Sequence, residues 1–104
     1  MNFEKELIES DESYLIKQDG SVTMIGSKKQ FTLEELQAFV GGYIRPVYAH
    51  QKYQKVFIVQ DDGHYNKELK HNRVATLTAK YGGALPLTQD FVGNVLLLNA
   101  NQLV

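Results

Sequence analysis

Histidine, serine and carboxylate side chains are the groups of this chain that could carry out catalysis or hold a metal ion. The three histidines are His50, His64 and His71, and no two of them have the i, i+4 spacing on one helix that a zinc site uses. No serine lies in the Gly-x-Ser-x-Gly elbow of a hydrolase, and there is no cysteine to act as a thiolate. The sequence therefore predicts no catalytic centre, no metal site and no cofactor.

Two glycine-containing segments resemble ligand loops only superficially. Asp61-Asp62-Gly63 lacks the alternating oxygen ligands and the terminal Glu of a calcium loop, and is typical of a turn. Gly41-Gly42 follows the end of a predicted helix, where free carbonyl groups disfavour an anion, whereas phosphate sites use the N–H groups of a helix start. We interpret these glycines as a helix cap.

Aromatic and basic residues alternate in the middle of the chain and form the candidate interaction surface. Tyrosine and arginine are enriched at protein interfaces. The same mixture can stack on and neutralise single-stranded nucleic acid, and tyrosines also half-bury their rings on small domains without any partner. All three interpretations stay open from the sequence. The residues of this candidate surface are Tyr43, Arg45, Tyr48, Lys52 and Tyr53.

Length and composition favour one soluble domain. The chain has 104 residues, of which 43% are hydrophobic and 22% charged, close to the average of globular proteins. It shows no signal peptide and no apolar run long enough to span a bilayer, so we expect a cytoplasmic protein without membrane contact. The first twelve residues carry five carboxylates and one lysine. We therefore divide the chain into an acidic arm or short helix at 1–12 and a single domain at 13–104.

Two helices are predicted from their caps. Thr32 and Glu35 have the spacing of a capping box, and apolar residues follow at helical spacing over 33–40. Asn72 is a good N-cap for a second helix over 73–81. Each predicted helix is followed by a pair of glycines, which are common where helices end.

Five strands complete the predicted order β-β-α-β-β-α-β. Asp19-Gly20 predicts a two-residue hairpin turn, Pro46 places its strand at a sheet edge or a bulge, and Gly93 indicates a bulge or a close backbone approach. We expect an α+β domain with a small mixed sheet and one main helix on one face, in a β-grasp-like layout. The predicted strands are residues 14–18, 21–25, 43–49, 55–60 and 91–98, of which 55–60 is expected to be buried on both faces.

Four different short motifs lie along the chain at characteristic separations. They are Phe31–Ile44 with its Leu-Glu-Glu-Leu and Val-Gly-Gly-Tyr-Ile runs, Val59–Gly63, Asn72–Thr76 and Val92–Leu96. Together, over about residues 14–99, they resemble a family of short uncharacterised domains carried by phages and conjugative elements of bacteria. The segment 68–71 departs from the Leu-Pro-Leu approach to the Asn that is usual there, and keeps only Leu69. The resemblance implies an accessory protein of a mobile element.

These observations favour a non-enzymatic binding protein. We expect an accessory protein of a phage or mobile element that contacts a host or element-encoded protein. Two alternatives are a single-stranded nucleic-acid-binding accessory protein and a protein that sequesters a small ligand such as a nucleotide. The net charge of −1 is less basic than is usual for a duplex binder.

Overall fold

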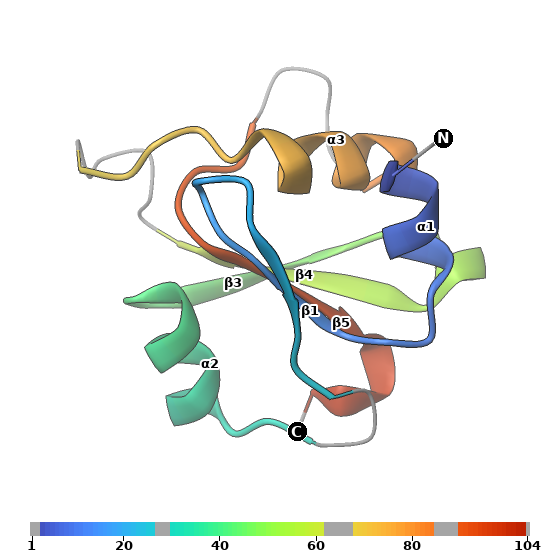
Figure 1. Cartoon of the computed structure of the whole chain (residues 1–104). Coiled ribbons are helices and arrows are strands. Elements are labelled where there is room, and N and C mark those ends of the chain that lie inside the picture. The colour runs from blue at the N-terminus through green and yellow to red at the C-terminus, as the bar shows by residue number, and fades with distance from the viewer. Residues whose placement is uncertain (1–2, 27–29, 62–67, 85–89, 104) are drawn as a thin grey trace.

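A five-stranded antiparallel sheet lies between two layers of helices in the computed structural model (Figure 1). The structure describes residues 3–26, 30–61, 68–84 and 90–103. The strand order across the sheet is β2-β1-β5-β4-β3. The strands are β1 (Tyr14–Ile16), β2 (Val22–Met24), β3 (Ile44–Tyr48), β4 (Lys55–Gln60) and β5 (Val95–Asn99), and the helices are α1 (Phe3–Glu9), α2 (Leu33–Val40) and α3 (Arg73–Tyr81).

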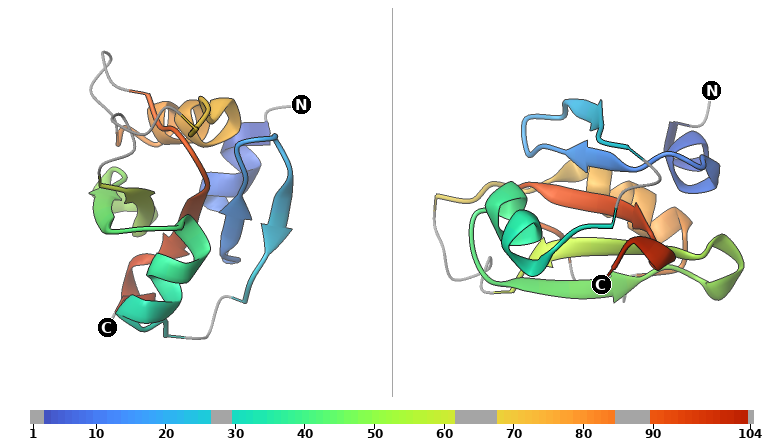
Figure 2. Two further views of the ribbon diagram at one scale, coloured as in Figure 1. Left: turned by 90° about the vertical axis from the view of Figure 1, so that its left-hand side faces the viewer. Right: turned by 90° about the horizontal axis from the view of Figure 1, so that it is seen from below.

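The two faces of the sheet carry separate hydrophobic cores. Figures 1 and 2 show α1 and α3 on one face and α2 on the other. In the central strand β5, Val95 and Leu97 pack in the core under α1 and α3, while Leu96 and Leu98 pack in the core under α2. All four side chains are fully buried. Their unbroken apolar run follows from this burial on both faces.

Several local predictions are confirmed. Thr32 and Glu35 form the capping box of α2, Asn72 caps α3, and β4 is buried on both faces. Pro46 lies in the edge strand β3, as predicted. The flanking backbone bonds at Ala49 and Tyr43 show that the nitrogen of Pro46 faces away from β4, where no ladder bond is lost.

The predicted α+β class and the order of strands and helices are confirmed, but the layers differ from the β-grasp-like expectation. All strand pairs are antiparallel rather than mixed, and the one parallel pairing among the described residues is an isolated bridge between Phe31 and Leu103. Helices also cover both faces, not one. The apolar runs of β4 and β5 require cover on both sides, and residues 3–9 supply part of it as α1, whose Leu7 and Ile8 are buried.

The hairpin between β1 and β2 has a longer loop than the predicted two-residue turn. The N–H of Gly20 donates to the carbonyl of Lys17 (3.0 Å), and the N–H of Lys17 donates to the carbonyl of Ser21 (2.9 Å). Within this loop only Gly20 has a positive φ, of 95°, whereas a type I′ turn would need a positive φ at Asp19 as well. The loop therefore spans three residues and closes on a left-handed glycine.

Asn72 joins three segments at the start of β5. Its side chain is 1% exposed, and its Oδ1 accepts the N–H of Ala75 (3.0 Å) in the first turn of α3. Its Nδ2 donates to the carbonyls of Ile16 (2.9 Å) and Gly93 (2.8 Å). Helix α3, strand β1 and the approach to β5 are thus held by one fully bonded amide.

We expect Asn72→Ala to lower the free energy of unfolding by about 3 kcal/mol or more, because it removes a cap and leaves two buried carbonyls without donors. The control is Thr32→Ala, which removes an exposed cap and costs about 1 kcal/mol. Urea unfolding followed by circular dichroism measures both. Equal losses in the two variants would contradict the role of Asn72.

Candidate functional site

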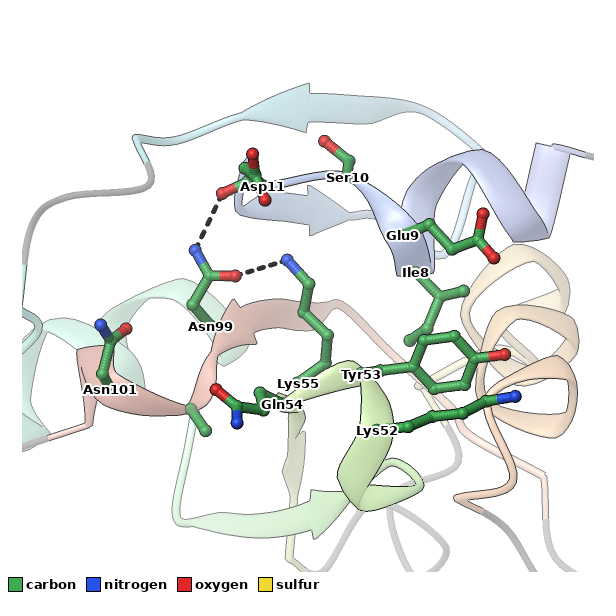
Figure 3. Close-up of a pocket in the computed structure, with 11 residues that line it drawn as sticks. Ile8, Glu9, Ser10, Asp11, Lys52, Tyr53, Gln54, Lys55, Asn99 and Asn101 are labelled. Carbon is green, nitrogen blue, oxygen red and sulfur yellow. Dashed lines mark hydrogen bonds between the residues drawn. The ribbon is translucent and has the colours of Figure 1, made fainter.

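The candidate functional site is a cavity of about 590 Å³ beside the end of β5 (Figure 3). Three segments line it: residues 8–11 at the end of α1 and just after it, residues 52–55 leading into β4, and residues 99–101 at the end of β5. Its volume lies within the range of small-molecule sites in proteins. The cavity therefore has the size for a ligand and is built from elements that the fold holds in place.

Backbone and amide hydrogen bonds bring these three segments together. Lys55 pairs with Asn99 in the register of β4 and β5, and the N–H of Ala100 donates to the carbonyl of Gln54 (2.9 Å). The Nδ2 of Asn99 donates to the backbone carbonyl of Asp11 (2.9 Å), which holds the connection between α1 and β1 against the end of β5. The cavity walls are thereby fixed by bonds from two neighbouring strands.

Lys55 is a buried cation in this cavity. It is 4% exposed, and its Nζ donates to Oδ1 of Asn99 and to the backbone carbonyl of Glu12 (3.4 Å). Both acceptors are neutral. Among the ion pairs that join described residues, none includes Lys55. The ammonium group is thus hydrogen-bonded but has no carboxylate in contact.

Burial lowers the pKa of Lys55 below its ordinary value of 10.5, because the charged form loses the solvation of water. The carboxylates of Asp11 and Glu12 act in the opposite direction, raising this pKa, but their effect is smaller. The desolvation of the ammonium group is therefore only partly compensated by the protein.

A 3-10 turn, η1 (Gln51–Tyr53), leads into β4 and forms the rim of the cavity beside Lys55. His50 caps this turn, since its Nδ1 accepts the N–H of Lys52 (3.2 Å). The ammonium group of Lys52 lies 5.0 Å from the ring centroid of Tyr53, within the range of a cation–π contact. The rim thus offers a cation and an aromatic face next to the buried Lys55.

The structure divides the predicted interaction surface into separate places. Lys52 and Tyr53 lie together at the cavity. Arg45 pairs with Val59, on the face of α1 and α3, whereas Tyr48 pairs with Val56, on the face of α2.

Tyr43 and Arg45 lie at the first end of β3, away from the cavity. Tyr43 is 74% exposed just before the strand, and Arg45 forms an ion pair of 3.5 Å with Asp61. The five residues therefore do not share one face of the sheet.

Sequence analysis missed Lys55 and Asn99 as members of a site. A signal for Lys55 was present, because it opens a strand predicted to be buried on both faces, where a lysine is unusual. Nothing in the sequence could pair it with Asn99, since that contact depends on the register of two strands 44 positions apart.

The predicted absence of a metal site concerns the histidines and one turn. His50 is a cap, and Nε2 of His71 lies 3.2 Å from Oδ2 of Asp90. His64 and the Asp62-Gly63 part of the predicted turn lie outside the described residues. Within the described ranges, no group of three or more potential metal ligands comes together.

The described helices are also all too short or too polar to cross a membrane.

The lowered pKa of Lys55 predicts a pH dependence of stability. Between that lowered value and 10.5 the unfolded chain binds more protons than the folded chain, so the free energy of unfolding rises with pH. We expect wild type to gain stability relative to Lys55→Met between the lowered pKa of Lys55 and 10.5, and the gain to level off above 10.5. Urea unfolding at a series of pH values measures this difference.

The matched control for this series is Lys52→Met, which removes a lysine from the exposed rim of the same cavity. A gain of the same size relative to Lys52→Met would contradict burial as the cause. So would a wild type that loses stability relative to Lys55→Met as the pH rises.

Comparison with known proteins finds one family. The model of the family described as a domain of unknown function, DUF3846, matches residues 11–102. No significant match was found to a curated protein or to a solved structure. The matched residues include all five strands together with α2 and α3, and begin after α1. The chain therefore belongs to the DUF3846 family, in agreement with its resemblance to a family of uncharacterised domains.

Proposed function

We propose that this chain is a non-enzymatic binding protein that holds a small polar ligand in the Lys55 cavity, with an anionic group of the ligand against Lys55. One observation carries the proposal: the ammonium group of Lys55 is buried, and its partners are neutral. A buried charge is normally paired with an opposite charge. A carboxylate or phosphate of the ligand would supply that pairing.

Other charges at the cavity do not outweigh Lys55. Glu9 and Asp11 also line it, but both are exposed, so water and salt screen their charges. The charge of Lys55 is screened much less because the residue is buried. A ligand anion that reaches Lys55 therefore gains a charge-assisted hydrogen bond to a group that is largely shielded from water.

The remaining lining suits recognition of a polar ligand. Gln54, Asn99 and Asn101 contribute amide groups that both donate and accept hydrogen bonds, and Tyr53 contributes a ring face. A few placed polar groups beside an aromatic surface are typical of small-molecule sites. This supports the small-ligand alternative from the sequence more directly than it supports nucleic-acid binding.

Contact with a protein partner is the second candidate function, and a groove between α2 and β3 favours it. This apolar groove of about 160 Å³ is lined by Leu33, Leu36 and Pro46 among others. Leu33 is 58% exposed, and Tyr48, on the same face of the sheet, is 59% exposed. Because Pro46 has no N–H at the free edge of β3, a partner would insert a side chain rather than add a strand.

The biological setting stays part of this proposal. The accessory role in a phage or mobile element, and the cytoplasmic location, come from the family resemblance and from the composition of the chain. They are compatible with either candidate function.

A thermal-shift screen of mononucleotides, small carboxylates and amino acids tests ligand binding. We expect at least one anionic compound to raise the melting temperature of wild type, since a ligand that binds only the folded state stabilises it. The shift is expected to disappear in Lys55→Met. It is expected to persist in Lys17→Met, which removes an exposed lysine outside the cavity.

A compound that stabilises wild type and Lys55→Met equally would contradict the role of Lys55. If no compound in the screen shifts wild type, and a partner captured by wild type is lost by Leu33→Ser, the second candidate replaces the first.

A further inference from the structure

The charged residues of the Lys55 cavity are sorted by wall. Glu9 is the last residue of α1, Asp11 lies just after it, and the two form the acidic wall. Lys52 and Lys55 come from η1 and β4 and form the basic wall. Figure 3 shows the two carboxylates along one side of the cavity and the two lysine side chains extending from the other side.

The two walls do not neutralise each other by direct contact. Of the ion pairs that join described residues, none links Glu9 or Asp11 to a lysine of the basic wall. Lys52 instead lies over the ring of Tyr53, and Lys55 is held by Asn99 and the carbonyl of Glu12. The cavity thus keeps opposite charges apart across a space large enough for a ligand.

A ligand with one charge gains from only one of the two walls. A simple anion gains from the basic wall and is weakly repelled by the acidic wall, whose exposed carboxylates are partly screened, and a simple cation gains only from the acidic wall. A molecule that carries both charges gains from both walls, and the gain is largest inside a partly desolvated cavity.

We infer that the ligand is a small zwitterion, an α-amino acid or a short peptide, with its carboxylate against the basic wall and its ammonium group against the acidic wall. This inference rests on the proposed function and specifies its ligand class. Tyr53 also lines the cavity, so an aromatic side chain of the ligand finds a matching surface there.

Three probes of the same ring and similar size separate the two charges. L-phenylalanine carries both charges, N-acetyl-L-phenylalanine carries only the carboxylate, and L-phenylalaninamide carries only the ammonium group. Titrations followed by ¹H–¹⁵N correlation spectra of the full chain give the affinities and show which residues respond. We expect phenylalanine to bind about tenfold more tightly than either analogue, with shifts at residues 8–11, 52–55 and 99–101.

Variants assign each charge to its wall. Asp11→Asn with Glu9→Gln should bring the affinities for phenylalanine and its N-acetyl analogue within about twofold, because the acidic wall is lost. The backbone carbonyl of Asp11 that binds Asn99 is retained. Lys55→Met should likewise bring the affinities for phenylalanine and phenylalaninamide within about twofold, because the buried cation of the basic wall is lost. Lys17→Met, outside the cavity, should preserve both ratios.

The outcomes separate this inference from the proposed function. If N-acetyl-phenylalanine binds the cavity as tightly as phenylalanine, the zwitterion is overturned while anion binding at Lys55 stands. The same holds if a mononucleotide binds there and none of the three probes binds at about 10 mM. If neither these probes nor any compound of the thermal-shift screen binds, both fail.

Discussion

The central strand β5 is buried on both faces, and the polar groups around its two ends must find partners inside the protein. At its start, Asn72 supplies three hydrogen bonds to α3, β1 and the approach to β5. At its end, Asn99 and Gln102 bind the segments that lie alongside, with Gln102 joined to Ser13 and to the carbonyl of Gly26 (2.9 Å). Amide side chains, two of them buried, thus hold the helices and outer strands to the core strand.

The polar groups at the two ends of β5 differ in how completely the protein pairs them. The amide of Asn72 uses every donor and an acceptor on backbone groups, which leaves nothing for a ligand. At the other end, the network includes the ammonium group of Lys55, whose partners are neutral and which lines an open cavity. At the start of β5, the neutral amide of Asn72 closes the network without any charge. The candidate ligand site therefore lies where the hydrogen-bond network that supports the fold includes a charge that the protein only partly compensates.

The sequence predicted what local chemistry decides. The capping box at Thr32, the Asn72 cap and the edge position of Pro46 each follow from a few neighbouring residues, and each is confirmed. Pairing across the chain was not predictable in this way. The antiparallel contact of β1 with β5, the second helical layer and the meeting of Lys55 with Asn99 all depend on how distant segments pack. For the same reason Arg45 and Tyr48 shared a predicted surface but lie on opposite faces.

The protonation of Lys55 tests the central claim most directly, because the claim is a buried ammonium group with no carboxylate in contact. Heteronuclear NMR of the chain labelled in its lysine side chains measures the pKa of each ammonium group in the folded state. The predicted result is that Lys55 titrates below 10.5, and that a bound anionic ligand raises its pKa by stabilising the charged form. A Lys55 that titrates at or above 10.5 without ligand would contradict the account.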